Sequence, residues 1–303
     1  MSAINGIIKN KYGFYWVKDR PNKEELEKYY GEKYYQEAKG SYEIEYDLNE
    51  QNYFINKIAQ KSFIIEQHLD DQTPKRFLDI GCGEGWALSY FKKKGWEVLG
   101  LDFSSFGCKK FNPDCSENMI AGNVYENLDK LIDEGRKFDV VWVDNVLEHV
   151  TDPEFLVADI KKIVSPSGIL VIEVPNDFSV IQEYALKNEY IDKSFWVVIP
   201  DHLSYFNKEG LENLLHSFGW ESISVIGDYP IDWSLLNPNT NYVKDKTKGK
   251  SCHRTRIEFE NLLHTMPTEK IVAFYKSMAD LGLGRSITGF FKLSKKTITA
   301  IKL

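Results

Sequence analysis

The sequence predicts an α/β fold with a doubly wound, Rossmann-like sheet. Short apolar runs alternate with segments of helical periodicity between residues 76 and 174. This alternation is typical of parallel strands with helices on both faces of the sheet. A glycine-rich turn, GCGEG at residues 81–85, lies between the first apolar run and the first helical segment. The chain has 303 residues, 43% of them hydrophobic and 27% charged, which is enough for a sizeable core.

Five apolar runs of strand length are the expected core strands, at residues 76–80, 97–102, 117–122, 138–144 and 168–174. Helices are expected at 85–95 and 153–164, where lysines in or near the last turn suit a helix C-terminus. Residues 207–219 predict a further helix, capped by Asn207 and ended by Gly219. A strand is expected to follow at 220–229.

The segments around this core suggest three domains. Residues 1–72 are polar and rich in tyrosine, and apolar side chains between 50 and 69 recur at near-helical spacing. We expect an N-terminal helical lid there, followed by a Rossmann-like core at 73–230. The tyrosines of the lid either close over a ligand and exclude water or simply pack the lid; the most notable are Tyr34, Tyr35, Tyr42 and Tyr46.

The third expected domain, residues 231–303, is a C-terminal extension. It begins with a polar loop at 231–256, which we expect to shape the acceptor site. Helical periodicity then predicts helices at 256–265 and 267–284, and residues 286–294 predict a possible last strand.

Composition excludes several classes of protein. A net charge of −7 argues against a general nucleic-acid binder, which needs a basic surface. No apolar run approaches the roughly 18 residues of a membrane span, and the N-terminus lacks the apolar region of a secretion signal. The cysteines form neither a disulfide framework nor CxxC metal motifs. We therefore expect a reduced, cytoplasmic protein; the cysteines are Cys82, Cys108, Cys115 and Cys252.

The glycine turn indicates which ligand the core binds. A dinucleotide motif would need a third glycine where Trp86 stands, and no P-loop lysine follows the turn. Asp79, just before the turn, would repel phosphates and attract an ammonium group. Asp102 ends the second strand, where a carboxylate can accept hydrogen bonds from both ribose hydroxyls. A ligand with a ribose and positive charge, but no pyrophosphate, fits S-adenosylmethionine.

Several stretches carry a family resemblance. LDIGCGEG, GLDFS and FDVVWVDNVLEHV resemble motifs of the class I S-adenosylmethionine-dependent methyltransferases. EVPND and DHLSYFNKEGLENLLHSFGWE are similar to a small-molecule subgroup common in bacterial sugar and surface-polysaccharide biosynthesis. The resemblance covers residues 76 to about 229. It implies that the cofactor is bound by Asp79, Gly81, Cys82, Gly83, Gly85, Asp102, Phe103, Asn123, Val124 and Asn145.

Asn123 departs from the family pattern, which usually has an acidic residue accepting the adenine amino group. The side-chain carbonyl of an asparagine can still accept that hydrogen bond. We therefore expect Asn123 to contact adenine through this oxygen.

Two histidines are candidate general bases for methyl transfer to a hydroxyl. His149 follows the fourth strand and His202 follows the fifth strand and an insertion, both near the carboxyl edge of the sheet. Glu148 could orient His149. The alternative is that both histidines only shape loops. No metal site is expected, because only two ligands are evident, and the other histidines are interpreted as structural or solvated: His68, His216, His253 and His264.

The acceptor site is predicted from the basic run KDKTKGKSCHRTR at residues 244–256. Arg254 and Arg256, at the start of an expected helix, could bind a phosphate or pyrophosphate of the acceptor, and Tyr205 is a further candidate contact. The alternative is a solvated loop.

The expected reaction is O-methylation of a small polar metabolite, with a sugar or sugar-nucleotide as first candidate and a homodimer as a possible assembly. N-methylation of an amino sugar is the close alternative, and sugar C-methylation is less favoured. An NAD-dependent oxidoreductase and a non-catalytic S-adenosylmethionine-binding protein are the rivals from other classes.

Overall fold

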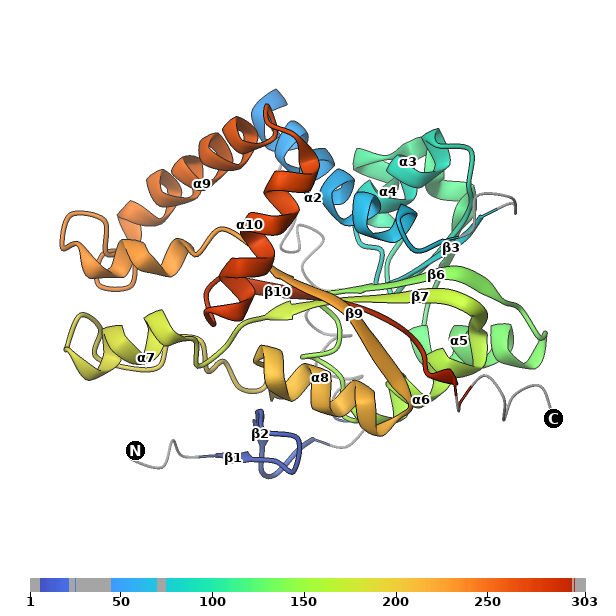
Figure 1. Ribbon diagram of the computed structural model, residues 1–303, viewed down its shortest axis with the longest axis horizontal. Helices are drawn as coiled ribbons and strands as arrows, with labels where there is room; N and C mark the ends of the chain where they lie inside the picture. Colours follow the sequence, from blue (N-terminus) through green and yellow to red (C-terminus); the bar gives the residue numbers. More distant parts are fainter. Residues whose placement is uncertain (1–5, 22–24, 26–44, 70–74, 296, 298–303) are drawn as a thin grey trace.

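A seven-stranded sheet with the order β5-β4-β3-β6-β7-β10-β9 forms the centre of the protein (Figure 1). The computed structural model describes residues 6–21, 25, 45–69, 75–295 and 297. The expected strands are present, which confirms the α/β prediction. They are β3 (Arg76–Ile80), β4 (Glu97–Asp102), β5 (Met119–Ala121), β6 (Phe138–Asp144), β7 (Val164–Pro175), β9 (Trp220–Gly227) and β10 (Ser286–Leu293).

Helices cover both faces of this sheet, and each face has its own apolar core. One core contains apolar side chains of α5 (Val124–Asp133), α6 (Pro153–Ile163) and α8 (Lys208–Ser217). The other contains those of α2 (Leu48–Glu66), α3 (Trp86–Lys93) and α10 (Thr268–Asp280). The remaining helices are α4 (Phe106–Phe111), α7 (Val180–Lys187) and α9 (Gly249–Leu263), with 3-10 turns at Pro113–Asn118, Ile231–Leu236 and Lys246–Lys248.

The chain changes direction across the sheet between β3 and β6. From β3 it proceeds to β4 and β5 on one side and then returns to β6 and β7 on the other, with all five strands parallel. In open α/β sheets, ligands bind outside the carboxyl ends of the strands at such a point. The fold therefore places the glycine turn, which follows β3, at the expected site.

The sheet differs from the expected all-parallel one at its last strand. β10 lies between β7 and β9 and is antiparallel to both. The reason is the path of the chain: β9 ends at the carboxyl edge, and Ser286 at the start of β10 pairs with Pro175 at the end of β7. The chain therefore has to run back through the sheet. β10 was assigned to the C-terminal extension, but it completes the core.

The N-terminal segment is only partly a helical lid. Residues 6–21 contain a hairpin of β1 (Ile7–Lys9) and β2 (Tyr15–Val17), and β2 pairs with β8 (Ser204–Tyr205). The helical part is α2, which starts after a capping box of Asp47 and Glu50. Tyr34, Tyr35 and Tyr42 lie outside the described residues.

The predicted loop at 231–256 is wrong in its second half, because α9 begins at Gly249. Only a narrow face of α9 is buried, through Cys252, Ile257 and Glu260, so its first turns are polar enough to resemble a loop. The four cysteines are buried free thiols, as expected. Among the described residues, no helix has the length and apolar character needed to cross a bilayer.

Candidate functional site

The glycine turn after β3 has a conformation that requires glycine. Gly81 and Gly85 both have φ of +78°, where a β-carbon is strained. A β-carbon on Gly81 would also lie 2.3 Å from a methyl group of Val146. The turn is held against the end of β4, because the N–H groups of Gly81 and Cys82 both donate to the carbonyl of Leu101, at 2.7 and 3.1 Å.

Asp102, at the end of β4, fixes the middle of this turn. Its carboxylate accepts hydrogen bonds from the backbone N–H groups of Gly83 and Ser104, each at 2.9 Å. Burial raises the pKa of Asp102, although these backbone hydrogen bonds favour its charged form. A carboxylate has about four lone-pair positions, so it retains acceptor capacity for the ribose hydroxyls. Phe103 follows it and packs partly buried against the core.

Asn123 has a different role from the one expected. Its side-chain oxygen accepts hydrogen bonds from the N–H groups of Tyr125 and Glu126, at 3.0 and 3.3 Å, and thereby caps α5. This capping competes for the same oxygen as the expected bond to the adenine amino group, which stays a prediction. The adjacent Val124 is nine-tenths buried and remains a predicted neighbour of adenine.

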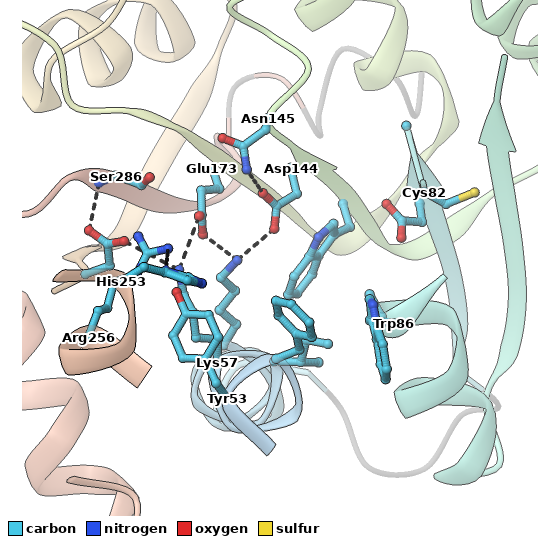
Figure 2. A pocket seen from close by; sticks show the side chains of 18 residues that line it. Tyr53, Lys57, Cys82, Trp86, Asp144, Asn145, Glu173, His253, Arg256 and Ser286 are labelled. Atoms are coloured by element: carbon cyan, nitrogen blue, oxygen red, sulfur yellow. Dashed lines mark hydrogen bonds and ion pairs between the residues drawn. The ribbon is translucent and has the colours of Figure 1, made fainter. Parts of the chain in front are cut away.

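A pocket of about 380 Å³ opens between the glycine turn, the carboxyl ends of β6 and β7, and α2. Figure 2 shows Cys82 and Trp86 on one side of it and His253 and Arg256 on the other. Four predicted cofactor residues line it: Asp79, Gly81, Cys82 and Asn145. The remaining lining is Tyr53, Phe54, Lys57, Ile58, Lys61, Trp86, Ala87, Trp142, Asp144, Glu173, Asp228, His253, Arg256 and Ser286.

Two lysines of α2 bind carboxylates at the wall of this pocket. Lys61 Nζ lies 2.9 Å from Asp144 and 2.5 Å from Glu173, and Lys57 Nζ lies 3.5 Å from both Glu173 and Asp228. Burial disfavours the ammonium of Lys61, but the two carboxylates outweigh this cost and raise its pKa. Burial likewise opposes the charge of Glu173, but the two lysines hold its pKa well below the ordinary value.

Asp79 and Asn145 lie where β3 and β6 end. Burial, followed by the nearby charges of Asp144 and Asp102, raises the pKa of Asp79 well above its ordinary value. A positively charged ligand would favour the ionised form of this side chain. Asn145 has a φ of +53°, a conformation that asparagine tolerates better than most residues. Its amide N–H donates to Asp144.

The side chains of His149 and His202 lie next to each other, although 53 positions separate them in the sequence. Their rings lie 4.8 Å apart at 84°, and Nδ1 of His149 is 2.7 Å from the carbonyl of Asp201. Glu148 is buried beside them, and burial raises its pKa well above the ordinary value. The three side chains lie just past β6 and are not among the residues lining the pocket. The predicted proximity of the two histidines is therefore present.

The two arginines predicted to bind the acceptor are separated by the structure. Arg256 lines the pocket and lies over the ring of Tyr53, whereas Arg254 is exposed and paired with Asp47 and Glu258. Both lie within α9 and not at its start. Nε of Arg256 is buried without a hydrogen-bond partner among the described residues. Arg256 is therefore the better candidate for binding an acceptor.

Tyr205 is a poor candidate for direct contact with an acceptor. Its side chain is fully buried, and its hydroxyl donates to the carbonyl of His202 at 2.9 Å. It therefore supports the loop that carries this histidine.

Most of the charged side chains at the pocket wall were not predicted from the sequence. Lys57 and Lys61 lie on the expected N-terminal helix, but the spacing of its apolar residues did not identify them as site residues. His253, interpreted as structural or solvated, lines the pocket, and its Nδ1 accepts from Arg256 at 3.0 Å. Asp228 directly follows β9, so its position at a strand end was the one signal available from sequence.

A family model described as a methyltransferase domain matches residues 53–225, more than half of the chain. The chain belongs to this methyltransferase family. Together with the geometry of the glycine turn, this assigns S-adenosylmethionine as the cofactor of the methyltransferase. The rival assignment as an NAD-dependent oxidoreductase is thereby wrong.

Sequence relatives of the methyltransferase include ubiquinone biosynthesis O-methyltransferases. The protein of Bartonella bacilliformis is 26% identical over 172 residues, which cover 56% of this chain and 68% of the relative. The protein of Mesorhizobium japonicum is 34% identical over 102 residues, covering 33% of this chain and 41% of the relative.

Solved structures resemble the fold of the methyltransferase. The cyclase SpnF has a TM-score of 0.50 at 15% identity, with 91% of this chain and 98% of that chain covered. An S-adenosylmethionine-dependent methyltransferase from Archaeoglobus fulgidus has a TM-score of 0.46 at 20% identity, covering 87% and 98% of the two chains. A fold can host different reactions, so the acceptor is argued from the site.

Replacing Asp102 with alanine should weaken S-adenosylmethionine binding by about 1.5–3 kcal/mol, the scale of hydrogen bonds to a charged acceptor. Calorimetric titration of the folded protein measures this loss. Asp102→Asn should lose less, because its remaining oxygen can still accept from Gly83. Unchanged affinity in a folded Asp102→Ala protein would exclude the ribose role.

Replacing Lys61 with methionine should lower the free energy of unfolding by about 3–5 kcal/mol, because it leaves buried carboxylates without their partner. Chemical denaturation measures the change. The matched control is Lys94→Met, which removes a half-exposed pair with Glu66 and should cost about 0–1 kcal/mol.

The loss in Lys61→Met should depend on pH. The depressed pKa of Glu173 stabilises the folded protein above the ordinary value of 4.5, and this stabilisation is lost as the pH falls through the folded-state pKa. The difference between wild type and Lys61→Met should therefore shrink at acidic pH. A difference independent of pH would show that packing, and not charge, is lost.

Proposed function

We propose that this methyltransferase transfers a methyl group to a hydroxyl of a small, polar metabolite, with a sugar or sugar-nucleotide as first candidate. The observation that carries the proposal is the charged wall of the pocket beside the cofactor turn. Lysine, arginine and carboxylate side chains line this space, and hydroxyl groups can donate to or accept from all of them. An apolar acceptor would leave the buried Nε of Arg256, which has no hydrogen-bond partner among the described residues, unsatisfied, which is costly.

O-methylation is supported by the names of the sequence relatives in ubiquinone biosynthesis. We do not propose the ubiquinone pathway of these relatives for this chain, because the charged pocket wall is better matched to a polyhydroxylated acceptor. N-methylation of an amino sugar remains the second candidate. The carboxylates Asp144, Glu173 and Asp228 at the pocket wall favour it, because they could bind an ammonium group.

The general base is proposed to come from the pair His149 and His202. Nδ1 of His149 lies 2.7 Å from the carbonyl of Asp201, and a carbonyl can only accept. In the neutral ring, Nδ1 therefore carries the proton and Nε2 holds the lone pair that can accept one. The buried free thiols favour a reducing compartment, and we propose the cytoplasm. Homodimer formation stays a prediction.

Replacing His202 with alanine should lower the turnover number by about 10²–10⁴-fold, the usual contribution of a general base. Cofactor affinity should change little. Steady-state production of S-adenosylhomocysteine with candidate sugars measures the effect, and His216→Ala, an exposed change on α8, is the control.

A drop confined to the Michaelis constant would make His202 a positioning residue and give the role of base to His149. If neither His149→Ala nor His202→Ala slows turnover, the hydroxyl proposal is wrong and the amine acceptor is favoured.

Replacing Arg256 with alanine should raise the Michaelis constant for an anionic acceptor by about 10–150-fold, equivalent to about 1.5–3 kcal/mol for a hydrogen bond to a charged group. Arg254→Ala is the matched control and should change it little, because that side chain is paired outside the pocket. Added salt should weaken acceptor binding more in the wild type than in Arg256→Ala. Equal effects of the two substitutions would exclude a specific role for Arg256.

A further inference from the structure

Three ligand-type side chains converge just past the carboxyl end of β6. Glu148, His149 and His202 each offer one ligand atom, and these atoms lie within 4.8 Å of one another. A carboxylate and two imidazoles are a ligand set that zinc and other divalent transition metals accept. Ligand atoms at about 2.1 Å from a tetrahedral ion are about 3.4 Å apart. Small side-chain rotations would therefore bring the three ligand atoms within bonding distance of one ion.

Hydrogen bonds hold together the two segments, distant in the sequence, that carry these three side chains. The carbonyl of Glu148 accepts hydrogen bonds from the N–H groups of Leu203 and Ser204, at 2.8 and 3.0 Å. Arg20 donates to the carbonyl of Thr151 at 2.6 Å and to the hydroxyl of Ser204 at 3.4 Å. The two ligand-bearing loops are therefore held together by bonds that do not involve the ligand atoms.

The ring of His149 is oriented as a metal ligand usually is. Such histidines donate one ring N–H to a carbonyl or carboxylate and bind the ion through the other nitrogen. Nδ1 of His149 is 2.7 Å from the carbonyl of Asp201, while Nε2 lies 3.7 Å from Oε1 of Glu148. The ring of His202 is nearly perpendicular to that of His149, with 4.8 Å between the ring centroids.

Glu148 provides an independent indication of a ligand. The residue is only 1% exposed, and its Oε2 has no hydrogen-bond partner among the described residues. A buried carboxylate oxygen without a partner carries a desolvation cost that a protein seldom leaves uncompensated. A cation held by the carboxylate and the two imidazoles would supply the missing partner.

We propose that Glu148, His149 and His202 bind one divalent transition-metal ion, with its remaining coordination positions open to water or to the acceptor. The ion-binding step stands without the proposed function, whereas its chemical role rests on it. An acceptor hydroxyl bound to the ion would have a lowered pKa and release its proton to solvent. Its oxygen then bonds to the methyl carbon as the methyl–sulfur bond breaks, and the electron pair stays on sulfur.

This role replaces that of a general base, because an imidazole whose lone pair binds the ion cannot accept a proton. The full chain, freed of metal with a chelator, should be titrated with Co²⁺ by visible absorption and with Zn²⁺ by calorimetry. We expect one ion per chain. Glu148→Gln and His202→Ala should each weaken binding by about 100-fold or more, since even outer partners of metal ligands contribute about 10–100-fold.

His216→Ala is the control for adventitious binding to surface histidines and should bind as wild type does. Co²⁺ should raise the unfolding midpoint of the wild type but not that of Glu148→Gln, and circular dichroism establishes that each variant is folded. A wild-type protein that takes up neither ion, or variants that bind as tightly as wild type, would overturn the proposal.

Activity distinguishes this proposal from the proposed function. A metal-free protein that methylates at full rate, while His202→Ala is slow, overturns the metal proposal and retains the general base. One bound ion per chain without methylation of any sugar overturns the proposed acceptor and leaves the metal site standing.

Discussion

The buried ion pairs between α2 and the carboxyl edge of the sheet determine how the site is built. Lys57 and Lys61 are removed from water, which is costly unless their charges are matched by close carboxylates. Glu173 provides that match for both lysines, and it accepts a further hydrogen bond from Thr288 of β10. These ion pairs therefore hold α2, which covers the pocket, to the central sheet. The pocket wall is charged as a consequence.

The same constraint explains why the antiparallel β10 matters to the site. The N–H groups of Ser286, its first residue, and of the preceding Arg285 donate to the carboxylate of Asp228, each at 2.7 Å. Asp228 is thereby held where it also pairs with Lys57. A segment more than a hundred residues beyond the glycine turn thus completes the side of the pocket opposite that turn.

Much of the fold and the cofactor side of the site could be predicted, because they depend on local patterns. The 27 consecutive residues 76–102 contain a buried parallel strand, a glycine turn and an acidic residue at the end of the next strand, and each can be identified from the sequence. The hairpin of β1 and β2 was missed because its strands have three residues each, too few to show alternation. The early start of α9 was missed because the exposed residues of its first turns are all polar or charged: Lys250, Ser251, Arg254 and Thr255.

The acceptor side depends on contacts between residues far apart, which no local pattern encodes. Lys61 binds the carboxylate of Glu173, which follows it by 112 positions, so the periodicity of its own helix could not identify this partner. For Asn123, in contrast, a local contact was the one that was missed. Its oxygen was assigned to a ligand, although a residue just before a helix also has the option of capping it. The capping bonds use the same oxygen, so the local role competes with the distant one.

The charges lining the pocket affect how strongly the methyl donor and the product of the reaction bind. Four carboxylates face three permanent cations; they are Asp79, Asp144, Glu173 and Asp228 against Lys57, Lys61 and Arg256. Burial and the neighbouring carboxylates raise the pKa of Asp79, so a bound cation would favour its ionised form. S-adenosylmethionine brings a net charge of +1 and so offsets the excess carboxylate.

Methyl transfer removes that positive charge, because S-adenosylhomocysteine has no sulfonium. The attraction between the pocket and the cofactor is then lost at the moment that the product forms, and this loss is larger in a buried site than in water. The carboxylates that favour binding of S-adenosylmethionine should therefore bind S-adenosylhomocysteine less strongly. We expect the carboxylates at the pocket wall to favour the positively charged methyl donor over the product.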